Sequence, residues 1–423
     1  MLLMNARIIT MSGRTIERGY LDIDPPLIRF VGEGSPDPDW LANYHDQVID
    51  LDGGWIVPGF IDAHCHIGMF TDGISVEGYD ANESSNPVTP DMQAIDGLFH
   101  DDFCFREALS YGVTSVMTGP GSANVISGTF SLVHTHGRSA DEMIIIRTAA
   151  MKAALGENPK RTHGRKDRSP VTRMANAAVL RDALQKAAYY QRKKNQPFSG
   201  QTGESASHEP DARWEALLPV LSGEVILKIH AHRSDDILTA VRIAESFGLR
   251  YTLDHCTEGY RVAELLANLY EEGRKPGHGC GEPGKGRLEG IITGPLLSDR
   301  SKPELARSCI ENPARLAATG IPVAIMTDHP VIPEQYLALS AAAAVRGGLP
   351  ETDALAAITI KAAEICGVAQ SRGTLDAGKI ADFSVFSAHP FDYRCQTRMV
   401  YIDGKLVWNH TDEKQTERSS CCV

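Results

Sequence analysis

The sequence predicts an α/β protein in which a (β/α)8 TIM barrel carries a small β-sandwich domain made from both ends of the chain. Three observations predict this fold class. Short apolar, β-rich runs recur along the middle of the chain, and several end in His or Asp. Helix-like runs lie between them, which indicates parallel strands joined by crossovers. Polar groups that follow several parallel strands meet at one face of such a barrel.

Both ends of the chain are predicted to be strand-rich. Residues 1–56 contain four short runs: Leu2 to Thr10, Tyr20 to Ile23, Leu27 to Val31 and Val48 to Leu51. Residues 371–423 add Phe383 to Phe386, Met399 to Ile402 and Lys405 to Trp408, followed by a tail expected to be disordered. Neither end has enough strands to bury a face alone, so we expect the two ends to pair. Residues 57–370 are left for the barrel.

The first barrel strand is the most informative segment. It reads Pro-Gly-Phe-Ile-Asp-Ala-His-Cys-His over residues 58–66, and the Pro-Gly turn fixes its start. Side chains alternate along a strand, so His64 and His66 project to the same side. Two imidazoles that converge from one strand predict half of a metal site. Residues 72–101 follow this strand as an insertion that is rich in Asn, Pro and Asp. The insertion lies on the same barrel face as the two histidines and is expected to form an entrance loop or lid.

Compatible partners end three later strand-like runs. His230 and His232 end the run that starts at Val225, His255 ends the next, and Asp328 follows Val323 to Thr327. His230 and His232 should share one face, and the residues alone do not decide which of them is a ligand. Neutral imidazoles and a carboxylate suit a divalent ion such as Zn, with Fe or Mn as alternatives.

Composition limits the functions that need to be considered. The chain has 423 residues, of which 42% are hydrophobic and 23% charged, as in ordinary soluble proteins. A formal net charge of −12 argues against general nucleic-acid binding. We find no apolar run long enough for a membrane span and no convincing signal peptide. Nine cysteines without CxxC spacing indicate reduced thiols, and we expect a cytoplasmic protein.

The chain resembles the amidohydrolase superfamily of metal-dependent hydrolases. The matching segments are PGFIDAHCH at 58–66, GVTSV at 112–116, IHAH at 229–232, the strand that ends at His255, TDHP at 327–330, and GTLDAGKIADF at 373–383. These segments extend over nearly the whole chain. Within the superfamily, the closest resemblance is to imidazolonepropionase-related amidohydrolases. None of the segments identifies a substrate.

This resemblance implies hydrolysis of a C–N bond in an amide, cyclic amide or peptide-like small molecule. It implies a metal site formed by His64, His66, Lys152, His230, His255 and Asp328. Asp328 would take a proton from the metal-activated water and return it to the departing nitrogen. His255 or His232 would help to polarise the scissile carbonyl. Superfamily members are commonly oligomeric, so a homo-oligomer is expected.

Lys152 decides whether one or two metals are expected per chain. It follows the strand-like run Met143 to Met151. Many superfamily members carry a lysine at a strand end that reacts with carbon dioxide and bridges two metals. A carboxylated Lys152 would make the site binuclear, whereas a plain lysine would contact the substrate or form an ion pair. Both alternatives stay open.

A local basic cluster suggests an anionic substrate. Six cations lie in a short stretch of this acidic chain: Lys160, Arg161, Arg165, Lys166, Arg168 and Arg173. Arg161 or Arg233 is the candidate for a bidentate pair with a substrate carboxylate, and a solvated loop is the alternative. His232 and His329 are the other candidate substrate contacts.

Two alternative functions remain. One is an imidazolonepropionase-type or deaminase-like ring hydrolase, although deaminases often need a Glu where Arg233 stands, three residues after His230. The other is a non-catalytic barrel scaffold, which the retained ligand-type residues disfavour. The sequence has no Gly-x-Ser-x-Gly elbow and no P-loop.

Overall fold

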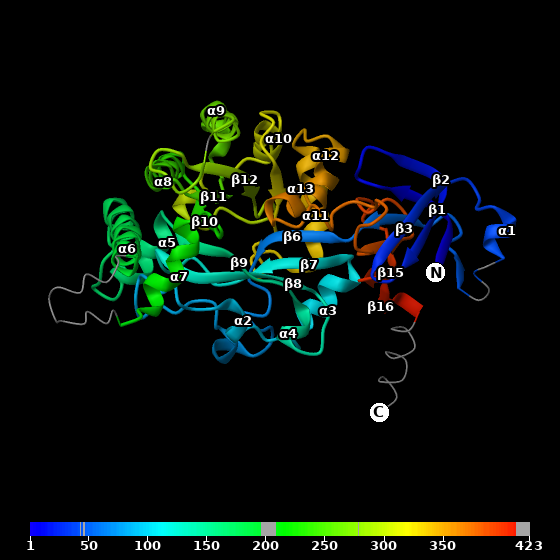
Figure 1. Cartoon of the computed structure of the whole chain (residues 1–423), viewed down its shortest axis with the longest axis horizontal. Coiled ribbons are helices and arrows are strands. Elements are labelled where there is room, and N and C mark those ends of the chain that lie inside the picture. Colours follow the sequence, from blue (N-terminus) through cyan, green and yellow to red (C-terminus); the bar gives the residue numbers. More distant parts are fainter. Residues whose placement is uncertain (43, 45–46, 196–208, 278, 412–423) are drawn as a thin grey trace.

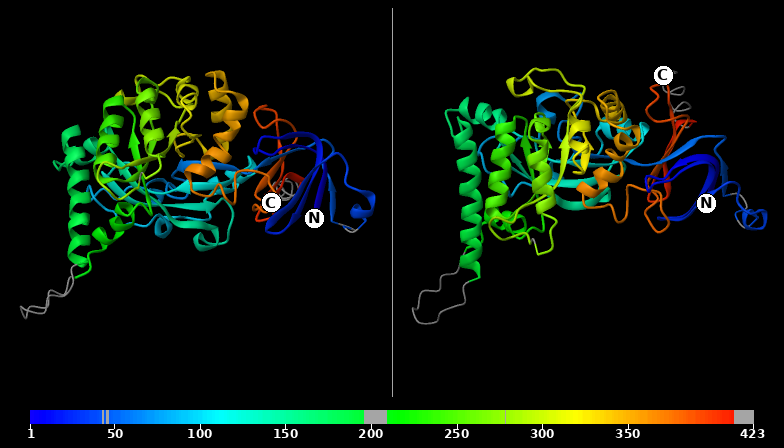
Figure 2. Two further views of the ribbon diagram at one scale, coloured as in Figure 1. Left: turned by 45° about the horizontal axis from the view of Figure 1, so that its top comes forward. Right: turned by 90° about the horizontal axis from the view of Figure 1, so that it is seen from above.

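The protein is an elongated α/β molecule with a barrel-like sheet and a smaller sheet (Figure 1). The computed structural model describes residues 1–42, 44, 47–195, 209–277 and 279–411. The predicted disordered tail at 412–423 lies outside the described residues. In Figure 2 the small sheet, which includes the N-terminus, lies at one end of the molecule and α6 lies at the other.

The strands are β1 Leu2–Ile9, β2 Thr15–Asp24, β3 Leu27–Glu33, β4 Val48–Asp50, β5 Trp55–Pro58, β6 Phe60–Cys65, β7 Val113–Thr118, β8 Ile126–His134, β9 Ile144–Ala154, β10 Ile226–Ala231, β11 Arg250–His255, β12 Arg287–Thr293, β13 Val323–Ile325, β14 Phe383–Phe386, β15 Thr397–Ile402 and β16 Lys405–Asn409. The α-helices are α1 Pro38–Leu41, α2 Ala94–Gly97, α3 Phe103–Ser110, α4 Ala140–Met143, α5 Glu157–Gly164, α6 Arg173–Lys194, α7 Ala212–Leu221, α8 Ser234–Phe247, α9 Ala263–Glu272, α10 Asn312–Ala317, α11 Leu337–Arg346, α12 Glu351–Ala356 and α13 Ile360–Ile365. Short 3₁₀ turns lie at Ser75–Gly78, Gly259–Arg261, Pro303–Leu305 and Glu334–Tyr336.

The barrel sheet has eight strands in chain order from β6 to β13. The prediction of strands in uniform parallel pairing is wrong for β8, which runs antiparallel to both β7 and β9. The reason is local. Only a short loop joins β7 to β8, and only the four-residue α4 separates β8 from β9, so neither connection is long enough to cross over to a parallel partner. All other neighbouring pairs in this sheet are parallel.

The two edges of this sheet approach each other at the end where the predicted ligands lie. The His66 amide donates to the His329 carbonyl at 3.0 Å, and the Asp328 amide to the His64 carbonyl at 3.3 Å. The segments after β6 and β13 are therefore hydrogen-bonded, and the sheet forms a nearly closed barrel. Parallel strand ends that carry His, Lys and Asp are brought to one face in this way.

The small sheet joins the two ends of the chain, as the strand count predicted. Its order is β16-β15-β14-β5-β1-β2-β3, with β4 on β1, so N-terminal β5 lies between N-terminal β1 and C-terminal β14. Its apolar core likewise draws on both ends, for example Leu21 and Ile56 with Phe383 and Tyr401. The hydrogen bonds form one continuous sheet where two sheets of a sandwich were predicted.

Helix α8 shows how the layer outside the barrel is attached. Its buried side chains Ile237, Ala240, Val241 and Ala244 follow the i, i+3, i+4, i+7 spacing of an amphipathic helix. They join the core cluster that contains Leu227, Ile229 and Leu253 of the neighbouring strands. Gly248, with φ of +66°, ends the helix in the left-handed conformation that glycine adopts readily. In the described ranges of the chain, no helix is long and apolar enough to cross a membrane.

Candidate metal centre

Two histidines are hydrogen-bonded through Nδ1, a third has its Nδ1 beside a carboxylate, and all three present Nε2 to one space. The His66 Nδ1 lies 2.7 Å from the Gly119 carbonyl, and the His255 Nδ1 lies 3.1 Å from the Gly294 carbonyl. A carbonyl only accepts, so both Nδ1 atoms carry the ring proton. The His64 Nδ1 lies 2.8 Å from the Asp254 carboxylate, which favours the same tautomer. Each Nε2 then keeps its lone pair, the arrangement found in metal-ligating histidines.

Asp328 faces two of these lone pairs. Its Oδ1 lies 3.3 Å from the His66 Nε2 and 3.6 Å from the His64 Nε2. The potential ligand atoms of His64, His255 and Asp328 all lie within 4.8 Å of one another. Asp328 and His255 hold left-handed backbones, with φ of +55° and +68°, a strained conformation that is uncommon for non-glycine residues and recurs at functional sites.

Buried carboxylates hold the end of β13 in place beneath this cluster. Asp62 Oδ2 accepts hydrogen bonds from the Thr327 amide and hydroxyl, at 2.8 and 2.7 Å. The Thr327 hydroxyl also lies 3.0 Å from Glu334 Oε2. Burial raises the pKa of Asp62 to about 6 and raises that of Glu334 as well. The residue before Asp328 is therefore fixed at both its amide and its side chain.

Four buried histidines of the site have a lowered pKa, which favours the neutral form that binds metals. Burial is the main cause that lowers the pKa of His64, His230, His232 and His255. The neighbouring Lys152 lowers each of these values further. Neutral imidazoles with a nearby carboxylate are a ligand set suited to a divalent cation.

Two buried lysines share the Asp254 carboxylate. Lys228 Nζ lies 3.3 Å from Asp254 Oδ2 and donates to the Ala63 carbonyl at 3.0 Å. Lys152 Nζ is farther from Asp254, at 3.9 Å, and lies 3.2 Å from the His64 Nε2. Burial lowers the pKa of Lys152 to about 8. Lys228 is thus the closer counter-ion of Asp254, and Lys152 faces the candidate ligands.

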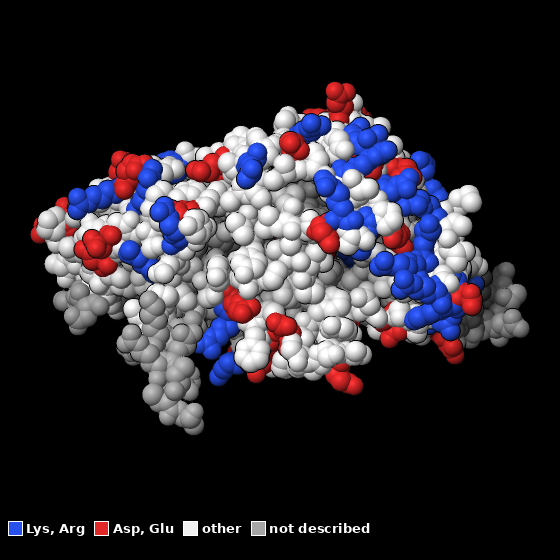
Figure 3. Space-filling model, turned by 180° about the vertical axis from the view of Figure 1, so that it is seen from behind, with Lys and Arg blue, Asp and Glu red and all other residues white. Residues whose placement is uncertain are grey.

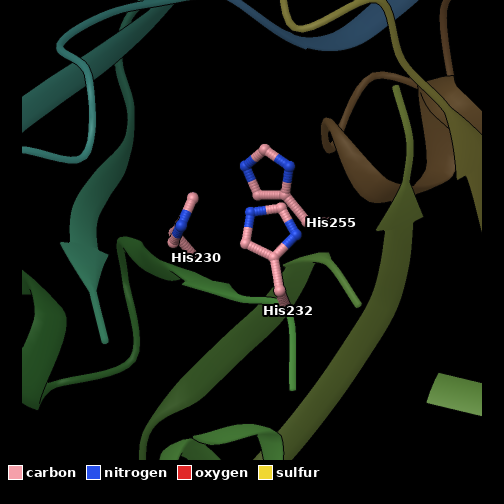
Figure 4. A group of neighbouring side chains, drawn as sticks. All are labelled: His230, His232 and His255. Carbon is pink, nitrogen blue, oxygen red and sulfur yellow. The ribbon is translucent and has the colours of Figure 1, made fainter. Parts of the chain in front are cut away.

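His230 and His232 lie against His255 and a buried carboxylate. Figure 4 shows the three rings turned towards a common space, and the His255 ring centroid is 4.2 Å from that of His230 and 4.4 Å from that of His232. The His232 Nδ1 pairs with the Thr257 hydroxyl at 2.7 Å. Glu304 Oε1 lies 3.6 Å from the His232 Nε2 and 3.9 Å from the His230 Nε2.

A pocket of about 270 Å³ opens beside these residues. Its lining includes His66, His230 and Asp328, together with two cations, Arg161 and Lys302. The loop inserted after β6 also reaches it, through Asn82, which agrees with the predicted entrance loop.

Two other predicted substrate contacts, Arg233 and His329, are engaged by neighbouring residues. Arg233 is not among the lining residues of this pocket, and its guanidinium forms two hydrogen bonds of 2.9 Å with the neighbouring Asp235. His329 is buried and accepts from the Glu334 amide through Nδ1, and burial lowers its pKa to about 4. We therefore carry Arg161, and not Arg233, forward as the anion-binding candidate.

Three other cations of the basic cluster, Lys166, Arg168 and Arg173, form structural contacts. Lys166 donates to the Ser84 carbonyl and hydroxyl, and Arg168 donates to the Ser85 carbonyl, so both hold the inserted loop. Arg173 pairs with Asp236. Figure 3 shows Lys and Arg side chains gathered at the end of the molecule that carries α6, interspersed with acidic ones. Within the cluster, only Arg161 lines the pocket.

Sequence reasoning missed Asp254, Lys228 and Glu304. Lys228 had a usable signal, because it precedes His230 by two residues on β10 and so shares its face. Asp254 had a weaker signal, because it stands beside His255 at the end of the same predicted strand. Strand alternation places these two residues on opposite faces, and the left-handed backbone at His255 departs from that alternation. Glu304 lies on a short turn far from the other residues in sequence.

Comparison with known proteins identifies the class. The amidohydrolase family profile matches residues 285–407. A crystal structure of an amidohydrolase from Thermotoga maritima MSB8 is 37% identical, with a TM-score of 0.86, and the match covers 97% of this chain and 100% of that one. The chain therefore belongs to the amidohydrolase family.

Two further relatives are informative in narrower ways. Amidohydrolase tasK of Hapsidospora irregularis is 30% identical over 378 residues, which are 84% of this chain and 37% of that protein. The chain thus spans little more than a third of the length of that curated relative. A prolidase in complex with N-methylphosphonate-L-proline is 18% identical, with a TM-score of 0.56 over 97% of this chain and 99% of that one, a likeness of fold alone.

Proposed function

We propose that the protein is a metal-dependent amidohydrolase that hydrolyses a C–N bond in an amide, cyclic amide or peptide-like small molecule. One observation carries the proposal. The Asp328 Oδ1 faces the Nε2 lone pairs of His64 and His66 at 3.6 and 3.3 Å. Acceptors this close repel one another unless a positive charge lies between them, and among the described lysines Lys152 contacts the His64 Nε2 but makes no such contact with the His66 Nε2 or the Asp328 Oδ1. A divalent cation satisfies all three.

The ligands in this proposal are His64, His66, His230, His255 and Asp328, with Lys152 as a further ligand if it is carboxylated. Zn is the favoured ion, with Fe and Mn as alternatives. A bound divalent ion would polarise the scissile carbonyl and supply a nucleophilic water near neutral pH. The same residues support one or two ions per chain.

The chain's own residues would handle the proton. The Asp328 side chain lines the pocket beside His66, so its carboxylate can take a proton from the attacking water and deliver it to the departing nitrogen. The Thr327 hydrogen bonds to Asp62 keep Asp328 in position. His255 and His232 lie close enough to assist polarisation of the carbonyl.

Arg161 would select a small anionic substrate. It lines the pocket, and its carboxylate neighbour, Glu157, is 3.9 Å away. A guanidinium can form a bidentate pair with a carboxylate. A cytoplasmic location and a homo-oligomer remain predictions.

Chelation and metal repletion test the function. The metal-free protein should hydrolyse no member of a panel of N-acyl amino acids, dipeptides and cyclic amides, and Zn²⁺, Mn²⁺ or Fe²⁺ should restore activity towards at least one of them. Asp328→Asn should stay at least about 100-fold less active than the wild type after repletion. Activity that survives chelation would contradict the metal-dependent mechanism, and a repleted protein inactive on every C–N substrate would favour a scaffold.

A further inference from the structure

We propose that Glu304 and His232, together with His230, form a second divalent-cation site, in which the Glu304 carboxylate is the anionic ligand. The inference rests on the proposed function and extends it. It assigns the negative charge of the second site to a residue other than Lys152, so carboxylation of Lys152 is not needed for a second ion.

Several buried polar atoms around Glu304 have no hydrogen-bond partner. The group comprises His230 Nδ1 and Nε2, His232 Nε2 and Glu304 Oε1. All three side chains are at least 97% buried. A buried carboxylate oxygen without a partner is costly, and so is a buried ring nitrogen. Glu304 Oε1 lies within 4 Å of the Nε2 atoms of both His230 and His232, and three such atoms together indicate a shared ligand.

The distances between these ligand atoms also fit one shared cation. Glu304 Oε1 lies 3.6 Å from the His232 Nε2 and 3.9 Å from the His230 Nε2, too far for a hydrogen bond. Two ligands bound to one cation through bonds of about 2.0–2.2 Å lie about 3–4 Å apart. The observed separations fit that range. The ligand atoms of His230, His232 and His255 also lie within 4.8 Å of one another (Figure 4).

The fold fixes the Glu304 carboxylate in this orientation. Its other oxygen, Oε2, accepts a hydrogen bond of 3.0 Å from the Glu157 amide at the start of α5. A Cβ at Gly156 would lie only 2.9 Å from that oxygen, and Gly156 has φ of +87°, so a glycine is needed there. One oxygen is thus held by the backbone while the other points at the two imidazoles.

The two cation sites would be neighbours. The His255 Nε2 is the only free lone pair of that ring, because Nδ1 is committed to the Gly294 carbonyl. His255 belongs both to the group with His64 and Asp328 and to the group with His230 and His232. It can therefore complete the ligand set of either ion, but not of both at once.

Metal stoichiometry tests the inference without reference to activity. The full chain is stripped with a chelator and dialysed against Zn²⁺ in buffers with and without bicarbonate, and zinc per chain is measured by elemental mass spectrometry. Glu304→Gln and His232→Asn should each hold one zinc fewer than the wild type in both buffers. Calorimetry should show the weaker zinc affinity reduced by more than about 100-fold.

Glu258→Gln is the matched control. Glu258 is also a buried glutamate that accepts from a backbone amide, at Ser234, but its other side-chain contacts are the Ser234 hydroxyl, Arg261 and Arg307, and none of these is an imidazole. This variant should keep the wild-type stoichiometry. If Glu304→Gln does not fold, His232→Asn and the control still decide the outcome.

The outcomes separate this inference from the proposed function. A second zinc that survives in Glu304→Gln but disappears in Lys152→Met or without bicarbonate would overturn the inference in favour of a carbamate. A single zinc that is lost in His66→Asn and unaffected by Glu304→Gln would overturn the inference alone. A wild-type protein that takes up no metal would overturn both.

Discussion

Replacing Asp254 by Asn should weaken metal binding without removing a ligand. Asp254 lies 2.8 Å from the His64 Nδ1, and this contact orients the ring towards the site. Loss of such an outer partner reduces metal affinity by about 10–100-fold, or about 1.4–2.8 kcal/mol. Asn has the same shape, so the change isolates the charge.

The same change should also reduce stability, because Lys228 loses its nearest anion. Breaking a buried ion pair by removing one partner costs about 3–5 kcal/mol. The Lys228 ammonium keeps its hydrogen bond to the Ala63 carbonyl, so the loss should fall towards the lower end of that range. The double variant Asp254→Asn/Lys228→Met removes the orphaned charge and should recover part of the stability while metal affinity stays low.

Two measurements separate these effects. Metal affinity is obtained by competition with a chromogenic chelator, and the free energy of unfolding of the metal-free protein by urea titration. The reasoning is refuted if the folded Asp254→Asn variant binds metal as tightly as the wild type. It is also refuted if the double variant regains both stability and affinity, since the defect would then come from the unpaired lysine.

Three more outcomes are expected. Asp328→Asn should lower kcat by about 10²–10⁴-fold through loss of the proton carrier, while Asp299→Asn, an exposed change beyond β12, should not. Arg161→Glu should raise KM for an anionic substrate by about 10–100-fold, whereas Arg165→Glu, four residues on and outside the pocket, should leave KM unchanged; equal KM values in both variants would remove the anion clamp. Burial raises the pKa of Tyr401 to about 12, so the unfolded chain releases this proton first and stability should fall as pH rises from 10 to 12. In Tyr401→Phe the urea midpoint should fall less over that interval, and identical slopes would contradict the assignment.

Patterns within short stretches of sequence predicted much of the fold and the pair of histidines at His64 and His66. Alternation along β6 places His64 and His66 together, and their surroundings confirm that both are buried at the end of a barrel strand. The count of strands at each end predicted that the two ends pair, and β5 and β14 do so. These inferences succeed because the information lies within a few consecutive residues.

The features that were missed depend on backbone geometry or on distant partners. The antiparallel β8 follows from connections too short for a crossover, which apolar periodicity does not report. Asp254 pairs with His230 across the parallel strands and contacts His64, whereas His255 leaves the extended conformation at φ of +68° and so departs from strand alternation. Arg233 is neutralised by Asp235 two residues away, a pairing that a list of cations overlooks.

The central claim is tested most directly by a crystal structure of the zinc-repleted protein with data collected on both sides of the zinc absorption edge. The account predicts an anomalous peak between the Nε2 atoms of His64 and His66 and the carboxylate of Asp328, and loss of that peak in His66→Asn. A well-occupied crystal with no anomalous peak among these three side chains would contradict it.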